Sequence, residues 1–240
     1  MGIIGISSNA CMDLPLERAL ETLSAKTGFV EIMSGGRHSL FTYGSVLPSF
    51  SLRYSVHCPV SDGNIAEPNE RIRKASVQVI ADIAGICDDL GVETLVLHPG
   101  YCLESDLFPA SEAALEKSIA ELGKIQEEYT VRFAMENMGS LDCLHFRYPS
   151  FLSIVRGAGL GFCLDVGHAY LNGVLDEFLQ MHPDHLHLHD NTGTADSHAA
   201  CGSGSVDFAT VLSVPVRSAV IECMTMDNVD ASLSYFADRL

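Results

Sequence analysis

The sequence predicts a (β/α)8 TIM barrel that forms a single domain over residues 1–240. Eight short apolar segments recur along the chain, and longer amphipathic segments lie between them. The short segments are nearly continuous in apolar character, as expected for parallel strands that are covered on both faces. The length of 240 residues is also close to that of an ordinary single-domain barrel.

The strands are expected where the apolar, β-rich segments fall. They are residues 2–6, 29–33, 53–57, 94–98, 131–136, 161–165, 185–189 and 219–223. A doubly wound open sheet is the alternative, but it usually has fewer strands and often a glycine-rich phosphate loop after the first one. Here Ser7-Ser8-Asn9 follows the first strand, without a G-x-G-x-x-G motif.

Helices are expected at residues 14–27, 69–90, 111–129 and 229–240. In the second of these, one face repeats at three- and four-residue steps and predicts the inward side: Ile72, Ser76, Val79, Ile80, Ile83, Cys87 and Leu90. Gly91 predicts where this helix stops. The third helix repeats the pattern with Leu115, Ile119, Leu122 and Ile125.

Composition excludes several classes of protein. With 47% hydrophobic residues the chain can bury a core, so disorder is not expected. The 31 acidic and 14 basic residues give a net charge of −17, which disfavours DNA and other polyanions as partners. No apolar run is long enough for a membrane span and no signal peptide is evident, so we expect a cytoplasmic protein without a membrane partner. The eight cysteines are spread singly and several lie in apolar runs, which indicates buried, reduced thiols.

Histidines and carboxylates gather at the predicted carboxyl ends of strands. The residues that stand at or shortly after these ends are His57, His98, Glu136, Asp165, His168, His187, Asp196, His198 and Glu222. In a barrel these ends converge on one mouth, where catalytic loops meet. Imidazole and carboxylate ligands from several directions suit divalent ions such as Zn²⁺ and Mn²⁺, so the sequence predicts a metal site.

Each of these residues also has a purely structural interpretation. A single His at a strand end is usually a hydrogen-bonded structural or surface residue. Asp165 with His168 could simply be a strand followed by a helix N-cap. The alternation in residues 185–189 puts three His on one strand face, which favours a polar site over packing. A metal centre accounts for all of these positions together, whereas the structural interpretation must hold independently at each strand end.

Several short segments match one known family. They are Val56-His57-Cys58-Pro59, Leu97-His98-Pro99-Gly100, Met135-Glu136-Asn137, Cys163-Leu164-Asp165-Val166-Gly167-His168, His187-Leu188-His189-Asp190-Asn191, Asp196-Ser197-His198 with Gly202-Ser203-Gly204, and Ile221-Glu222. On these segments the chain resembles the xylose isomerase-like TIM-barrel superfamily. That superfamily includes sugar and sugar-phosphate isomerases and epimerases, and the endonuclease IV type of apurinic-site endonuclease (AP endonuclease family 2).

The resemblance implies one to three divalent metal ions in the chain. The endonuclease pattern implies one ion on His57, His98 and Glu136, and a second on Glu136, Asp165, His187 and Glu222. A third ion is implied on His168, Asp196 and His198, with His189 beside the ligands. The epimerase pattern implies one ion on Glu136, Asp165, His187 and Glu222, with the two Glu also acting as acid and base.

Two reactions follow from these patterns. In the first, favoured here, a metal polarises the carbonyl of a sugar or sugar phosphate while Glu136 and Glu222 remove and return a proton. A substrate phosphate would need a cation, and Arg37, Arg53 and Arg147 are candidates.

In the second, a metal-dependent phosphodiesterase acts at apurinic or apyrimidinic sites in DNA. The complete ligand set favours it, whereas the net charge opposes it. Val60 and Ser61 are also poor wedges for insertion between bases. A metal-binding protein without catalysis is a third possibility, but it would leave the paired acid–base positions without a purpose.

Overall fold

The computed structural model describes residues 4–237 and 239, and within them eight parallel strands close into a barrel in sequence order. This confirms the predicted (β/α)8 barrel. The strands are β1 (Ile4–Ser7), β2 (Phe29–Met33), β3 (Arg53–His57), β4 (Thr94–Leu97), β5 (Arg132–Glu136), β6 (Gly161–Asp165), β7 (His185–Leu188) and β8 (Ser218–Ile221). The predicted strand positions 2 and 3 and the predicted helix positions 238 and 240 lie outside the described residues.

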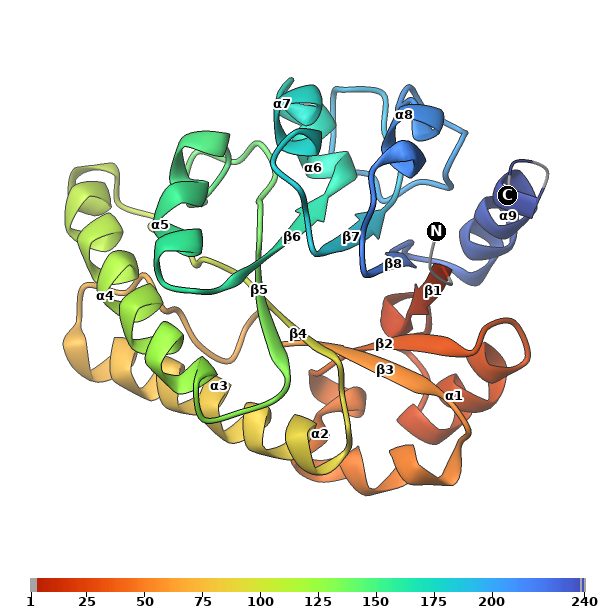
Figure 1. Ribbon diagram of the computed structural model, residues 1–240, viewed down its shortest axis with the longest axis horizontal. Coiled ribbons are helices and arrows are strands. Elements are labelled where there is room, and N and C mark those ends of the chain that lie inside the picture. Colours follow the sequence, from red (N-terminus) through yellow and green to blue (C-terminus); the bar gives the residue numbers. More distant parts are fainter. Residues whose placement is uncertain (1–3, 238, 240) are drawn as a thin grey trace.

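Helices connect the strands over the same described residues. The α-helices are α1 (Leu16–Ser24), α2 (Leu40–Tyr43), α3 (Glu70–Asp89), α4 (Phe108–Gln126), α5 (Leu152–Gly157), α6 (Val166–Leu171), α7 (Leu175–Leu179), α8 (Phe208–Ser213) and α9 (Met226–Ala237). Short 3-10 turns are η1 (Ser8–Cys11), η2 (Gly36–His38), η3 (Gly44–Ser49), η4 (Ser105–Leu107) and η5 (Pro149–Phe151). Figure 1 shows the helices around the outside of the strands, with α9 beside β1.

The strand register aligns the carboxyl ends of the strands at one mouth. β1 closes the barrel against β8 with Ile4 opposite Ala219 and Ile6 opposite Ile221. Strands β2, β3 and β6 begin and end where the sequence predicts. β8 ends at Ile221, earlier than predicted, so Glu222 is the first residue of the loop that follows.

One predicted helix face is wrong in α3. Ile72, predicted to face inward, is 49% exposed, whereas Arg73 is 1% exposed. The Arg73 guanidinium donates to Glu70 and Glu121, at 2.8 Å each, and to Ser118 Oγ at 2.9 Å. A buried charge is tolerated when it is paired and hydrogen-bonded, and here it joins α3 to α4. The aliphatic periodicity could not reveal a polar residue on the inner face.

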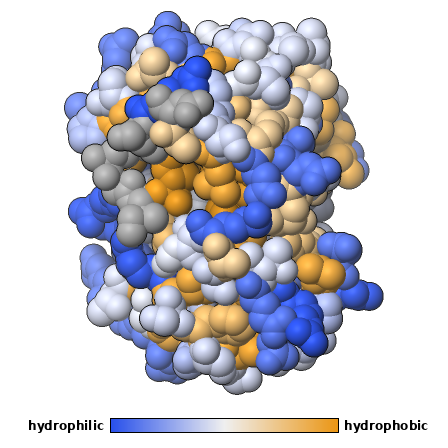
Figure 2. Space-filling view, turned by 90° about the vertical axis from the view of Figure 1, so that its right-hand side faces the viewer, coloured by the Kyte–Doolittle hydropathy of each residue, from blue (hydrophilic) through white to orange (hydrophobic). Residues whose placement is uncertain are grey.

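The main apolar core lies between the strands and the surrounding helices. The large buried side chains there include Phe133, Phe162, Phe178 and Phe208. All eight cysteines are free, and all but Cys143 are buried, as the sequence predicts. On the face of the molecule that Figure 2 shows, hydrophilic residues surround several apolar patches. Within the part of the chain that the structure describes, no helix combines the length and apolarity needed to cross a membrane.

Candidate metal centre at the barrel mouth

Four predicted ligands form a buried cluster where β5, β6, β7 and β8 end. His187 Nδ1 lies 3.2 Å from Glu136 Oε1, 3.3 Å from Glu222 Oε2 and 3.9 Å from Asp165 Oδ2. One donor atom from each residue lies within 4.8 Å of the others. We call Glu136, Asp165, His187 and Glu222 the deep cluster. Its imidazole and three carboxylates are a donor set that Zn²⁺ and Mn²⁺ accept.

Two further histidines meet the other oxygen of Glu136. Its Oε2 lies 3.1 Å from His57 Nε2, at the end of β3, and 3.2 Å from His98 Nε2, just after β4. The three residues also offer donor atoms within 4.8 Å of one another. Glu136 therefore presents one oxygen to the deep cluster and the other to this histidine pair, an arrangement that could bridge two ions.

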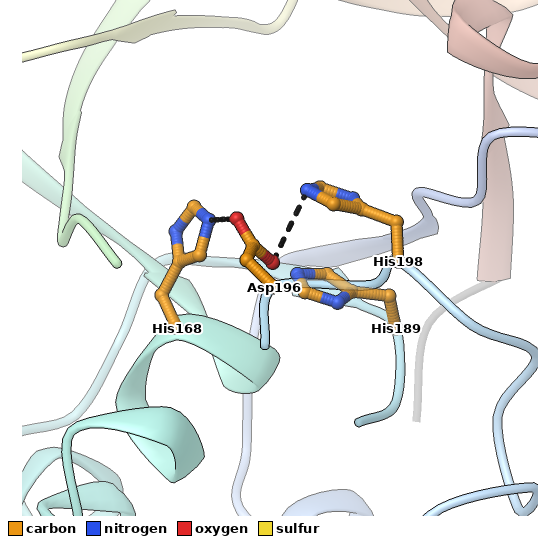
Figure 3. Close-up of side chains that lie close together, drawn as sticks. All are labelled: His168, His189, Asp196 and His198. Atoms are coloured by element: carbon orange, nitrogen blue, oxygen red, sulfur yellow. Dashed lines mark hydrogen bonds and ion pairs between the residues drawn. The ribbon is translucent and has the colours of Figure 1, made fainter. Parts of the chain in front are cut away.

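The remaining predicted ligands lie together on the β6 and β7 side of the mouth (Figure 3). His168 Nε2 is 3.0 Å from Asp196 Oδ2, and His198 Nε2 is 3.5 Å from Asp196 Oδ1. His189 completes the group, its ring stacked 3.9 Å from that of His198. We call His168, Asp196 and His198 the outer cluster. The structure thus brings all nine predicted ligands to one mouth in three neighbouring groups.

Asp165 performs the structural role that the sequence leaves open and also belongs to the site. Its Oδ1 accepts the His168 backbone N–H at 2.6 Å, which caps α6. The same oxygen lies 2.9 Å from His189 Nε2. Gly167 is required between them, because a Cβ there would collide with the His189 ring. The N-cap and ligand interpretations of Asp165 are therefore compatible.

The pKa values in the outer cluster show strong coupling between imidazoles and carboxylates. Burial lowers the pKa of His168, but Asp165 and Asp196 outweigh it and raise the pKa to about 10. Burial likewise lowers the pKa of His198, while Asp196 and Glu222 raise it to about 9. Protons on these rings balance the carboxylates, and a divalent cation would replace them in that role.

In the deep cluster, the carboxylates stay ionised despite burial. Burial raises the pKa of Glu136, but His187 and His98 hold that pKa well below its ordinary value. The pKa of Glu222 is also lowered, because His187 outweighs the opposing effect of burial. Three carboxylates this close repel one another unless positive charge lies among them. The donor set therefore fits a divalent ion.

The loop between β7 and α8 carries Asp196 and His198, and Asp190 holds it in place. The buried Asp190 carboxylate accepts five backbone N–H groups at 2.9–3.1 Å, from Asn191, Gly202, Gly204, Ser205 and Val206. His198 itself adopts a left-handed φ of 42°. A non-glycine residue persists there only when its surroundings fix it. Asp190 belongs to the family segment His187-Leu188-His189-Asp190-Asn191, but its role as the anchor of this loop was not predicted from the sequence.

A second residue that the sequence analysis missed is Glu31 in β2. It is fully buried inside the barrel, where its carboxylate lies 3.0 Å from His185 Nε2 and 2.9 Å from His187 Nε2. The sequence does contain a signal for this residue, since Glu31 is the one acidic residue in the apolar segment Phe29–Met33. Charged residues are rarely found in strands that are buried on both faces.

One candidate phosphate-binding arginine is in the wrong place. Arg53 begins β3, at the end of the barrel away from the mouth, and pairs with Glu93 at 2.6 Å. It is therefore excluded as a partner for a substrate in the mouth. Arg37 and Arg147 do lie in loops after strands. Arg147 pairs with Asp142 at 2.8 Å, and Arg37 donates to the Asp13 carbonyl at 2.6 Å.

Comparison with known proteins identifies the family. Residues 43–214 match the family described as xylose isomerase-like TIM barrel. The chain belongs to this family. A relative from Methanocaldococcus jannaschii, Uncharacterized protein MJ1614, is 34% identical over 211 residues, covering 85% of this chain and 84% of its own.

Proteins similar to this chain carry names from both sides of the predicted choice. A solved structure described as a D-tagatose 3-epimerase-like protein is 26% identical, with a TM-score of 0.88, over 99% of this chain and 96% of its own. A Probable endonuclease 4 from Aquifex aeolicus is 31% identical over 134 residues, covering 53% of this chain and 46% of its own. Family membership alone therefore does not choose between the two reactions.

Proposed function

We propose that the protein is a divalent-metal-dependent epimerase or isomerase of a sugar or sugar phosphate, with Glu136 and Glu222 as its acid and base. The observation that carries this proposal is the deep cluster. Glu136 at the end of β5 and Glu222 just after β8 approach the same nitrogen of His187, at 3.2 and 3.3 Å. This arrangement supplies two proton-transfer groups around one position for a cation.

Each glutamate is suited to accept a proton from carbon next to a carbonyl. Both side chains are almost fully buried, and both have lowered pKa values, so both are ionised at neutral pH. A bound Zn²⁺ or Mn²⁺ would supply the positive charge that polarises the carbonyl and acidifies the adjacent C–H. Epimerisation then requires one glutamate to remove the proton from carbon, while the other first takes up a proton from solvent and then delivers it to the opposite face; the first glutamate afterwards releases its proton to solvent.

The charge of the mouth supports a small substrate over DNA. In the described chain, the segments from each strand to the next helix contain two Lys or Arg residues, Arg37 and Arg147. The acidic residues in the same segments are Asp13, Asp62, Glu67, Glu104, Asp106, Asp142, Asp190, Asp196, Asp207 and Glu222. Duplex binding depends on cations that contact phosphates, and this mouth has few of them.

A phosphodiesterase acting at abasic sites is the second candidate. It is supported by the outer cluster, which an epimerase of the one-ion type does not require. It is opposed by the acidic loops. The loop after β3 also offers only Val60 and Ser61 where a duplex would need a bulky wedge.

Solvent exchange tests the epimerase proposal directly. The protein is stripped of metal, reloaded with Mn²⁺ or Zn²⁺, and incubated in D2O with a panel of ketopentoses, ketohexoses and their phosphates. We expect deuterium to appear by NMR at the carbon next to the carbonyl of one substrate. Exchange should be lost in Glu136→Gln and Glu222→Gln, because each variant lacks one proton-transfer group.

The control is Glu93→Gln, which makes the same change at a surface ion pair away from the mouth. It should exchange deuterium at the rate of the unaltered protein. A duplex containing one abasic analogue is tested alongside. Cleavage of that duplex, lost in Glu136→Gln and without sugar exchange, would replace the epimerase proposal by the phosphodiesterase.

A further inference from the structure

A polar layer inside the barrel lies beneath the deep cluster, and the proposed reaction does not explain it. Glu31 on β2 is fully buried there, together with Ser55 on β3 and His185 on β7. TIM-barrel interiors are ordinarily filled by branched apolar side chains. A buried carboxylate is unfavourable unless its oxygens are paired, so the position of Glu31 needs a reason.

One oxygen of Glu31 is fixed by hydrogen bonds from the neighbouring strands. Its Oε2 accepts Ser55 Oγ at 2.8 Å and lies 3.0 Å from His185 Nε2. The other ring nitrogen of His185 lies 2.7 Å from Ser218 Oγ on β8. Groups from β3 and β7, supported by β8, therefore hold the carboxylate in one orientation.

The other oxygen of Glu31 is turned towards His187. Its Oε1 lies 2.9 Å from His187 Nε2 as an ion-pair contact, and neither atom has a hydrogen-bond partner with good geometry among the described residues. The opposite ring nitrogen, Nδ1, faces Glu136 and Glu222. The His187 ring thus lies between the fixed carboxylate of Glu31 and the carboxylates of the deep cluster.

We propose that Glu31 is a positioning residue for the metal centre: it keeps a proton on His187 Nε2 and so leaves Nδ1 free as a ligand. A neutral imidazole carries its proton on only one nitrogen, and the partner of that nitrogen decides which one can bind metal. The fixed carboxylate also limits rotation of the ring. This inference rests on the proposed metal-dependent function, because it assigns Glu31 to the deep cluster.

Zinc titration of Glu31→Gln tests the role. The substitution keeps the shape of the side chain but removes the charge that holds the His187 proton. It is made in an Asp196→Ala/His98→Ala background, which removes a ligand from the outer cluster and from the group of His57, His98 and Glu136, so that a competing chromogenic chelator reports the deep cluster. We expect the Zn²⁺ dissociation constant to rise by about 10- to 100-fold. When Glu31→Gln is the only substitution, Zn²⁺ binding at the outer cluster should be the same as in the unaltered protein.

Two companion variants separate positioning from general structure. Ser55→Ala removes one hydrogen bond to Oε2 but leaves the carboxylate, so its effect should be smaller. Glu93→Gln is the surface control and should have no effect. If Glu31→Gln does not fold, as judged by circular dichroism, Glu31→Asp replaces it. The Asp side chain is one methylene shorter, so its carboxylate lies farther from His187, and this variant should also weaken Zn²⁺ binding.

Two results would overturn the inference. The first is an unchanged Zn²⁺ affinity in a folded Glu31 variant. The second is an additional Zn²⁺ ion that is lost in Cys163→Ser. Cys163, His185 and His187 offer donor atoms within 4.8 Å of one another, so such an ion would show that this layer binds metal itself. By contrast, normal Zn²⁺ binding without solvent exchange in the unaltered protein would contradict only the epimerase proposal.

Discussion

Glu222 has two proposed tasks in one side chain, as a ligand and as a proton-transfer group. Its Oε2 lies 3.3 Å from His187 Nδ1, and the side chain is almost completely buried. We predict that Glu222→Gln weakens Zn²⁺ or Mn²⁺ binding and lowers turnover by about 10²- to 10⁴-fold, the usual contribution of a general acid or base. Elemental analysis and the exchange assay measure the two effects. Unchanged metal content and turnover would show that the site is elsewhere.

The imidazoles of the outer cluster make the stability of the metal-free protein depend on pH. The ordinary pKa of 6.5 is raised to about 10 for His168 and to about 9 for His198. Folding therefore favours their protonated forms. This contribution is complete below about pH 6.5, decreases as the pH rises, and is lost once the pH passes the folded pKa values.

We accordingly predict that the urea midpoint of the metal-free protein falls between pH 6.5 and 10. Zn²⁺ affinity at the outer cluster should rise over the same range, because the ion competes with fewer protons. Urea titrations at several pH values check the first effect. In His168→Asn the decline should be shallower. A midpoint that rises with pH in the unaltered protein would contradict the assignment.

The histidine ligands could be predicted from sequence because they stand at strand ends, where a polar side chain has no packing role. Glu31 could not be assigned in the same way. It lies in the middle of β2, and its partners His185 and His187 are far from it in the chain. Only the closed barrel brings β2 and β7 face to face across the interior. A single sequence therefore shows that Glu31 is charged, but not that it contacts His185 and His187.

At the scale of elements, the loop between β7 and α8 depends on one carboxylate. Asp190 accepts five backbone N–H groups, and an amide in its place would turn a donor towards some of them. We predict that Asp190→Asn lowers the free energy of unfolding by about 2–3 kcal/mol, because buried donors lose a charged acceptor. It should also expose the loop to proteases and reduce metal binding at the outer cluster.

The matched control for this prediction is Asp207→Asn at the end of the same loop. Asp207 caps α8, and Asn is an equally good N-cap, so stability should change little. Urea unfolding and limited proteolysis compare the two variants. Equal stability and equal cleavage would mean that Asp190 does not anchor the loop.

Element positions were predictable wherever apolar character was continuous. β2, β3 and β6 have the predicted bounds, because each ends at a polar residue or a turn. The inner face of α3 was only partly predictable. Ser76, Ile80 and Ile83 face inward as expected, but Ile72 is exposed and Arg73 is buried. The ion pairs of Arg73 with Glu70 and Glu121 explain why Arg73, and not Ile72, is buried in the first turn of α3. Hydrophobic periodicity carries no information about such pairs.

For the whole molecule, the net charge of −17 contains two different contributions. Glu136, Asp165 and Glu222 belong to the deep cluster, where a divalent cation would offset them. Most of the remaining acidic side chains lie at the surface, including many of those in the loops around the mouth. Metal binding would therefore offset most of the negative charge at the floor of the mouth and leave its rim negative. A small polyol can reach such a floor, whereas a duplex must first approach the rim.

This distribution predicts how the protein behaves towards DNA. Non-specific DNA binders typically have dissociation constants of about 10⁻⁴–10⁻⁶ M at physiological salt, and that affinity comes from Lys and Arg on phosphates. With Arg37 and Arg147 as the basic residues of the mouth loops, we expect no saturable anisotropy change with a fluorescent abasic duplex up to about 10⁻⁵ M protein. Metal loading should not alter this result, because the rim stays acidic. Saturable binding that weakens steeply with salt would reveal a basic surface used for phosphates, and the phosphodiesterase would then become the better proposal.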